Sequence, residues 1–266
     1  MSWQGNRPRH LKPFTKIIIA LVVICALLLL VLLVRSLRKG LPPPSATLTT
    51  PGKPSATERT VGFPELRAKP NPANKTFRGC PPEGDGGDPA LNRLKNRVDE
   101  GSYIAVGFDA LKNLPWPKKV ERRDRDRWSS SDLAEVERYE GTPVVVEGYL
   151  ADAKLMGPES PNCHGADKEF RDYHIWLTKE AGDDRTGSIV IETTPPIREN
   201  HPSWRTDVLN KIGKAQQRVR ISGWLLLDPE HPDQVGKTRG TIWEIHPIMK
   251  IEVQQNGLWK SVDEIP

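Results

Sequence analysis

The sequence predicts a mainly β protein in which a small five-stranded barrel carries a few short helices. Residues 142–266 contain five segments rich in β-branched and aromatic residues and bounded by turn-forming residues. A helical segment follows the third of them, so the predicted order is β-β-β-α-β-β. Gly148 and Gly223 lie inside predicted strands, where glycine suits the bends that close a small barrel. This order matches an OB-like Greek-key barrel, with another small barrel or a sandwich as the alternative.

The helix between the third and fourth strands is predicted over residues 203–214, because Trp204, Val208, Leu209 and Ile212 recur at helical spacing. The predicted strands span residues 143–153, 170–178, 188–194, 217–227 and 239–253.

A small helical extension, residues 76–141, precedes the barrel and is expected to pack on it. Asp88 is a good N-cap residue, a proline follows it, and Leu91, Leu94 and Val98 recur at helical spacing. These features predict an amphipathic helix that begins just after Asp88.

A second helix of the extension is predicted to begin at Ser131 and Asp132, with Glu135 completing a capping pattern, and to end at Gly141. Residues 103–114, between the two helices, fit a short strand followed by a helical turn.

Near the N-terminus an apolar run, residues 17–34, predicts a single-pass transmembrane helix. Its 18 uncharged residues, at about 1.5 Å per residue, span nearly the whole hydrocarbon core of a bilayer. A cleaved signal peptide is the alternative, but the run is long for one and continues into Arg35, Arg38 and Lys39 without a cleavage site. The basic leader, residues 1–16, favours a signal-anchor with a cytoplasmic N-terminus.

The chain has a net charge of +5, but its positive charge is concentrated next to the predicted anchor. Residues 1–39 contain seven Lys or Arg and no Asp or Glu, and residues 35–75 are rich in proline and predict an extended tether. Residues 76–266 then sum to −5. The predicted folded part therefore lacks the positive field that nucleic-acid binding requires, which disfavours a nucleic-acid partner.

Two of the three cysteines, Cys80 and Cys163, lie in the predicted folded part, whereas Cys25 lies in the predicted membrane span. Because the predicted topology places the folded part in an oxidising compartment, Cys80 and Cys163 are expected to form a disulfide. The alternative is a pair of free thiols.

Strand alternation predicts one face of each strand that carries polar side chains. His174 lies on such a face of the second strand, Glu192 on the third, and Glu244 and His246 on the last. If the barrel brings these faces together, the four side chains form one cluster that is able to bind a divalent metal or perform acid–base chemistry. The alternatives are a hydrogen-bonded structural network or solvent-facing side chains.

His231 lies in an acidic loop, residues 228–233, between the last two predicted strands. Together with His174 and His246 it is a candidate metal ligand, with a plain turn as the alternative. The chain contains no G-x-S-x-G, no G-x-x-x-x-G-K-[ST] and no H-E-x-x-H motif, so the sequence assigns no catalytic residue and no cofactor.

Three segments carry a resemblance to a family. Residues 172–177, 223–228 and 239–247, the last with the motif Trp-Glu-Ile-His-Pro, resemble a group of uncharacterised bacterial exported proteins with OB-like domains. The resemblance covers residues 76–260 and implies a bacterial, exported barrel. It implies no particular activity.

These observations predict a membrane-anchored binding module whose C-terminal, periplasmic domain lies outside a bacterial inner membrane. The bilayer is one expected partner, through residues 17–34, and a protein or glycan ligand is favoured over nucleic acid. The alternative is a metal-dependent hydrolase or nuclease-like enzyme that uses the His/Glu cluster.

Overall fold

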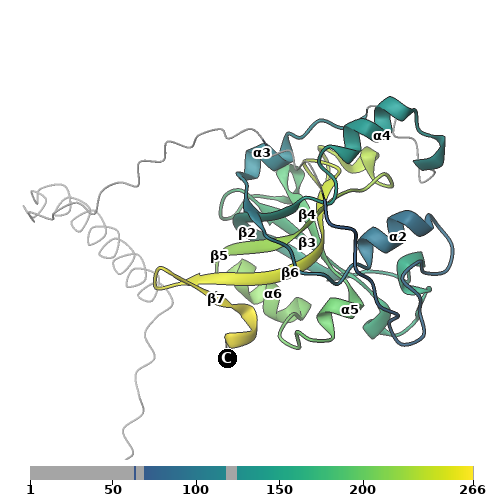
Figure 1. Ribbon diagram of the computed structural model, residues 1–266. Coiled ribbons are helices and arrows are strands. Elements are labelled where there is room, and N and C mark those ends of the chain that lie inside the picture. Colours follow the sequence, from purple (N-terminus) through teal and green to yellow (C-terminus); the bar gives the residue numbers. More distant parts are fainter. Residues whose placement is uncertain (1–62, 64–68, 118–124, 266) are drawn as a thin grey trace, which may run out of the picture. The chain divides into compact units, whose positions relative to one another are not determined.

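The computed structural model describes residues 63, 69–117 and 125–265, which all belong to the unit Glu58–Pro266 (Figure 1). The predicted leader, the predicted span and nearly all of the predicted tether lie outside the described residues. Within the described part of the chain, no helix is long and apolar enough to cross a membrane.

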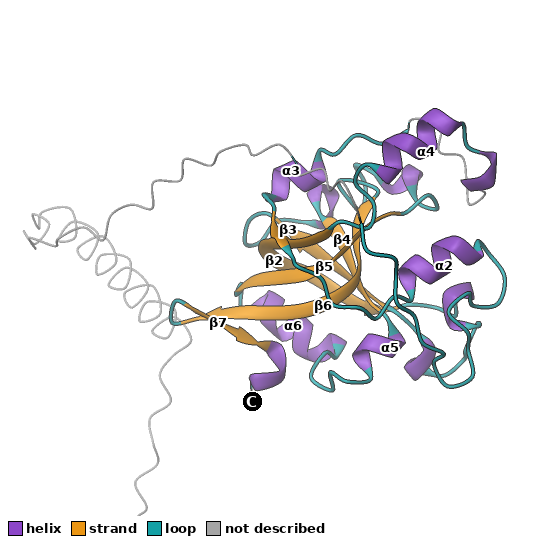
Figure 2. Ribbon diagram, viewed as in Figure 1, coloured by secondary structure: helices purple, strands orange, loops and turns teal. Residues whose placement is uncertain are grey.

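Five strands close into a barrel at the centre of the unit (Figure 2). Neighbouring strands follow the order β2-β3-β4-β6-β5, and β5 pairs again with β2. The β4–β6 pair is parallel and the other barrel pairs are antiparallel. The prediction of a mainly β fold with a closed five-stranded barrel is confirmed. The strands are β2 (Pro143–Leu155), β3 (Tyr173–Thr178), β4 (Ile189–Thr193), β5 (Arg218–Leu227) and β6 (Trp243–Gln255).

Alternate residues of the strands fill the barrel interior. Ile175 and Leu177 of β3, Ile189 and Ile191 of β4, and Ile245 of β6 are completely buried. Because successive side chains of a strand point to opposite faces, the residues between them point to the outer face of the barrel. The polar residues predicted to cluster belong to this outer set.

Strand β2 pairs with two neighbours in succession, with β5 through residues 143–149 and with β3 through residues 149–155. Gly148 lies at the changeover, where a Cβ atom would lie 2.4 Å from the carbonyl oxygen of Thr178. Gly223 lies at a shift of the β5–β6 register, where a Cβ atom would lie 2.5 Å from a backbone oxygen of β6. Both glycines therefore permit close backbone contacts at irregular points of the barrel.

Strands β3 and β6 begin three and four residues later than predicted, and both differences place polar residues in loops. Residues Lys168–Phe170 form a 3-10 turn, so β3 begins at Tyr173 rather than at residue 170. Strand β6 begins at Trp243, because the amide of Gly240 donates to the carbonyl of Ser188 instead of extending the β5–β6 ladder.

The helices lie outside the barrel. As predicted, α2 (Pro89–Lys95) begins after Asp88, whose carboxylate accepts hydrogen bonds from two amides of the first turn. The N-cap of α4 (Ser130–Glu137) is Ser129, two residues before the predicted start, because its hydroxyl accepts from the amide of Asp132. The remaining elements are β1 (Ile104–Ala105), α3 (Phe108–Lys112), α5 (Pro195–Arg198), α6 (Thr206–Lys214) and β7 (Leu258–Ser261).

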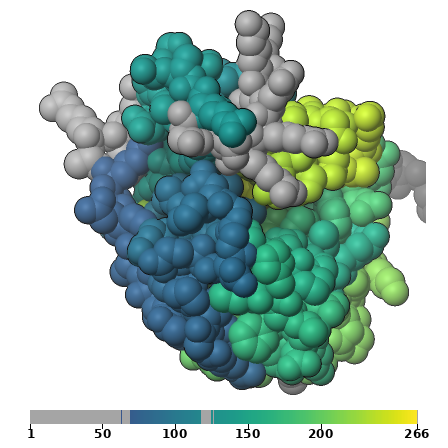
Figure 3. All heavy atoms as spheres, turned by 90° about the vertical axis from the view of Figure 1, so that its right-hand side faces the viewer, coloured from purple at the N-terminus to yellow at the C-terminus, as the bar shows by residue number. Residues whose placement is uncertain are grey.

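A disulfide joins the segment around α2 to the β2–β3 loop. It connects Cys80 and Cys163, so the predicted pairing is confirmed. Beside it, the side-chain amide of Asn96 donates to the carbonyl of Pro161 at 2.8 Å. Figure 3 shows this N-terminal segment, in blue, next to the green β2–β3 loop. We call residues 77–98 the N-terminal cover.

Candidate functional site: a buried histidine–carboxylate cluster

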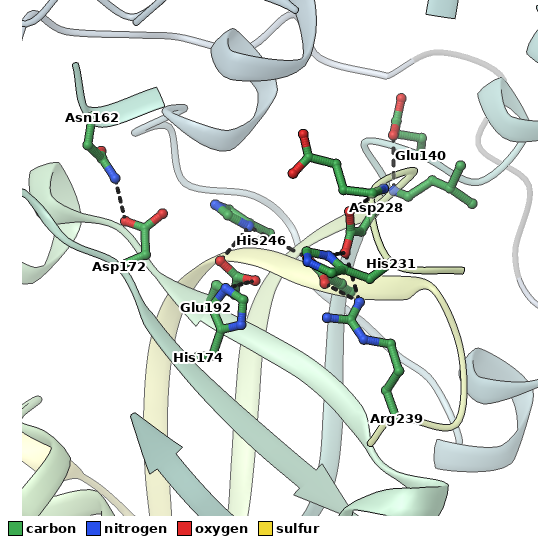
Figure 4. Close-up of polar contacts among 12 residues, drawn as sticks. Glu140, Asn162, Asp172, His174, Glu192, Asp228, His231, Arg239 and His246 are labelled. Atoms are coloured by element: carbon green, nitrogen blue, oxygen red, sulfur yellow. Dashed lines mark hydrogen bonds and ion pairs between the residues drawn. The ribbon is translucent and has the colours of Figure 1, made fainter. Parts of the chain in front are cut away.

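Polar side chains of three neighbouring strands meet on the outer face of the barrel. In the antiparallel β3–β4 ladder, His174 lies directly opposite Glu192. In the parallel β4–β6 ladder, Glu244 lies opposite Val190. Val190 is two residues before Glu192 and shares its face of β4. Since His246 follows Glu244 on the same face of β6, the sheet itself brings the four predicted residues together. Figure 4 shows three of them, His174, Glu192 and His246, close to one another.

The four residues are in direct contact. Nε2 of His174 lies 2.7 Å from Oε1 of Glu192. Nδ1 of His246 lies 3.3 Å from Oε2 of Glu192 and 3.7 Å from Oε2 of Glu244. None of the four is more than 7% exposed. The structure therefore shows a sealed polar cluster rather than the solvent-facing side chains considered as an alternative.

Asp172, which precedes β3, extends the cluster on the side of the β2–β3 loop. Its Oδ1 atom accepts a hydrogen bond of 2.9 Å from the side chain of Asn162, and the carboxylate is completely buried (Figure 4). Sequence reasoning did not include Asp172 in the predicted cluster. Strand parity was the available signal, because Asp172 lies two residues before His174.

Arg239 of the β5–β6 loop extends the cluster on the opposite side. Its Nη1 atom lies 2.9 Å from Oδ2 of Asp228 and 2.6 Å from Oε1 of Glu244. All three side chains are less than 5% exposed. No local pattern pointed to Arg239, because the sequence placed it at the start of a strand.

The N-terminal cover contributes one side chain to the cluster, that of Lys95 in the last turn of α2. It is buried, and its charge interacts with the carboxylates of Glu192, Asp228 and Glu244. Burial alone would lower the pKa of Lys95, but these carboxylates raise that pKa overall. The available signal was its position one turn after Leu91, on the predicted apolar face of the helix. The buried cluster thus consists of Lys95, Asp172, His174, Glu192, Asp228, Arg239, Glu244 and His246.

Burial shifts the proton affinities inside the cluster in opposite directions. Burial raises the pKa of Glu192 well above its ordinary value, and the nearby carboxylate of Glu244 raises it further. Burial also raises the pKa of Asp172, while it lowers the pKa of His174 and lowers that of His246 strongly. Both histidines are therefore neutral near neutral pH, the form in which imidazole binds a metal.

His231, the third predicted metal candidate, lies at the edge of the cluster. Its Nδ1 atom lies 2.6 Å from Oδ2 of Asp228, and its side chain is one-third exposed. Among the contacts of the described residues, none joins His231 to His174 or His246. The structure therefore separates it from the other two candidate ligands.

Replacing His231 by Gln is expected to remove a pH-dependent part of the stability. Its hydrogen bond to Asp228 raises the pKa of His231, although burial opposes the shift. Because the folded-state pKa lies above the unfolded value of about 6.5, the stabilising contribution is complete below pH 6.5 and is lost as pH rises through the folded-state pKa. The difference in melting temperature between wild type and His231→Gln should thus shrink as pH rises from 6 to 9. A difference that stays constant over this range would contradict the prediction.

Several atoms at the centre of the cluster have no hydrogen-bond partner: Oδ2 of Asp172, Oε2 of Glu192 and both ring nitrogens of His246. Donor atoms of these three residues all lie within 4.8 Å of one another. Two carboxylates and one imidazole are a donor set that Zn²⁺ and other divalent transition metals accept. Among the described residues, these three are the ones able to hold a metal.

A second feature is an open groove on another part of the barrel. It has a volume of about 560 Å³ and lies between the β1–α3 segment and the outer surfaces of β2 and β5. Tyr149 lines it, and Glu147 and Arg218 form an ion pair of 2.7 Å across β2 and β5. The lining carries side chains of both charge signs.

No family model matches the chain, and no curated protein matches it.

Proposed function

We propose that the chain is a membrane-anchored, extracytoplasmic binding module built on an OB-like barrel. The strand order β2-β3-β4-β6-β5, the closing β2–β5 pair and the helix α6 between β4 and β5 support the OB-like assignment. The closed barrel also fits the exported bacterial proteins that the Trp-Glu-Ile-His-Pro segment resembles.

Two features of the chain, its apolar N-terminal run and its disulfide, support the proposed location. Residues 17–34 are long and apolar enough for a span, and the leader before them is basic. The Cys80–Cys163 disulfide supports an oxidising compartment for the folded part, because such bonds persist mainly outside the cytoplasm. We therefore propose a bacterial inner-membrane anchor with the barrel in the periplasm.

The observation that carries a binding role is the contrast between the sealed cluster and the open groove. A hydrolase or nuclease must bring its substrate to the catalytic side chains, yet His174, Glu192, Glu244 and His246 are all buried under the surface. The groove, by contrast, is open and has the volume typical of a ligand site. A binding function is thus supported better than the alternative of a metal-dependent hydrolase.

The chemistry of the groove favours a protein segment as its ligand, with a glycan as the second choice. Its lining carries two carboxylates and three cations, namely Glu147, Glu180, Lys179, Arg218 and Arg220. Each of the three cations is paired with a carboxylate, so the groove offers both charge signs rather than a positive track for phosphates. The net charge of −5 over residues 76–266 points the same way.

A photo-reactive amino acid in place of Tyr149 tests this proposal in the full chain, within the membrane of the cell that makes it. The expected result is one discrete adduct with a protein of the cell envelope, which weakens when Arg218→Glu reverses the charge of one wall. The control places the same amino acid at Leu258 of β7, which is 66% exposed and lies outside the groove. Identical adducts at both positions, no adduct at position 149, or an adduct with nucleic acid would each overturn the proposal.

A further inference from the structure

Three side chains with metal-binding chemistry converge inside the buried cluster from three separate parts of the sheet. Asp172 precedes β3, Glu192 lies on β4 and His246 lies on β6. Their donor atoms lie within 4.8 Å of one another, and all three side chains are buried. A binding site of this kind is assembled by the barrel itself and needs no local sequence motif.

The spacing of Glu192 and His246 fits a shared ion better than a direct hydrogen bond. Oε2 of Glu192 and Nδ1 of His246 lie 3.3 Å apart, and neither atom makes a hydrogen bond. Two donor atoms, each about 2.0–2.1 Å from a tetrahedral ion, lie about 3.4 Å from one another. The separation of these two atoms therefore matches that of two ligands of one ion, and a donor atom of Asp172 lies within 4.8 Å of both residues' donor atoms.

The atoms that lack partners are the atoms that an ion would use. Oδ2 of Asp172, Oε2 of Glu192 and the ring nitrogens of His246 are unpartnered. The other oxygen of each carboxylate is occupied, by Asn162 in one case and by His174 in the other. Metal sites typically show this division, in which one set of contacts orients the ligands and leaves the inner atoms for the metal.

The formal charges of the buried cluster also leave room for a dication. It contains four carboxylates and only two permanently charged cations, which leaves an excess of two negative charges when the histidines are neutral. Buried charge without compensation is unfavourable, and either protons or a cation must offset it. The carboxylates are Asp172, Glu192, Asp228 and Glu244, and the cations are Lys95 and Arg239.

We propose that Asp172, Glu192 and His246 bind one divalent transition-metal ion, of the Zn²⁺ or Mn²⁺ class, that fastens β3, β4 and β6 together beneath the N-terminal cover. His174 and Asn162 are positioning residues, because each holds the outer oxygen of a ligand carboxylate. The role is structural, since the site is sealed. The inference does not rest on the proposed groove ligand or on the membrane location.

An acidic pocket lies beside the cover. It has a volume of about 240 Å³ and is lined by Asp88, Glu159, Glu230 and His164, and Lys95 lines it as well. Lys95 also interacts with Glu192 and Glu244, so it belongs both to the lining of this acidic pocket and to the buried cluster.

Metal uptake by the full chain, purified in detergent without a histidine tag and stripped with a chelator, tests the proposal. After addition of Zn²⁺ or, separately, Mn²⁺ and gel filtration, elemental analysis should find about one ion of at least one of them per chain, and the melting temperature should rise. Glu192→Gln and His246→Gln should each weaken the binding by at least about 100-fold. His174→Gln, which changes a positioning residue, should weaken it about 10–100-fold and keep the stoichiometry of one.

The matched control is Glu252→Gln, a buried carboxylate of β6 that pairs with Arg220 outside the cluster and should leave metal uptake unchanged. Circular dichroism of each variant establishes that it is folded. If a ligand variant does not fold, metal uptake by the stripped wild-type chain is the measurement that tests the proposal. Failure of that chain to take up either ion, or uptake that persists undiminished in folded His246→Gln, overturns the proposal, the latter result indicating adventitious surface binding.

Discussion

Arg239→Met is expected to lower the free energy of unfolding by about 3–5 kcal/mol, the usual effect of removing one partner from a buried ion pair. The Arg239 side chain is 2% exposed and is the direct cationic partner of Glu244, with Nη1 to Oε1 at 2.6 Å. Without it Glu244 loses its ion-pair partner and keeps the charge interaction with Lys95, whereas Asp228 keeps its contact with His231. Thermal unfolding followed by tryptophan fluorescence, with chelator present, should show a fall on the order of 10 °C.

The control for this prediction is Arg205→Met, which removes an exposed pair with Asp207 and should change stability by less than about 1 kcal/mol. A double variant, Arg239→Met with Glu244→Gln, should recover part of the loss, because the unpaired charge is then gone. If Arg239→Met is no more destabilising than the control, the buried ion pair is not a determinant of stability. If the double variant recovers nothing, the loss is one of packing rather than of charge.

Removing the disulfide is expected to lower the free energy of unfolding by about 4 kcal/mol in the chain-entropy model, because the bond closes a long loop. Cys80 and Cys163 are 83 residues apart in the sequence. The double variant Cys80→Ser/Cys163→Ser should therefore melt roughly 10 °C below wild type. Because the bond holds the N-terminal cover against the β2–β3 loop, the cover should also be cleaved by a protease faster in this variant than in wild type.

Cys25→Ser is the matched control, since it removes the one cysteine outside the pair and leaves the bond intact. Thiol labelling of the unfolded wild-type chain should detect one cysteine without reductant and three with it. Equal labelling in the two conditions, or equal melting temperatures of wild type and the double serine variant, would contradict this account.

The barrel was largely predictable from the sequence, because its signals are local. Segments rich in β-branched and aromatic residues became β2 to β6, and residues 203–214 contain α6 in its predicted place between β4 and β5. The errors lie at strand ends. Arg239 was placed in a strand because the segment that begins with it is rich in β-branched and aromatic residues, yet the contact between Gly240 and Ser188, far apart in the chain, ends the ladder at Trp243.

The site was predictable only where strand alternation applies. Alternation pointed to His174, Glu192, Glu244 and His246, and the ladders bring them together. It said nothing of Arg239, which reaches the cluster from a loop. Lys95 and Asp228 likewise come from outside the strands, and only long-range packing brings them to the cluster.

The sequence by itself therefore determined which side chains share a strand face, where the net positive charge is concentrated and which two cysteines were available to pair. These properties depend on the period of a strand and on composition, and both are local. Only the tertiary structure decided that the polar face is buried and is completed by cations from other elements. The reason is that burial depends on what covers a surface, and here Lys95 comes from a segment 79 to 151 positions away from the histidines at 174 and 246.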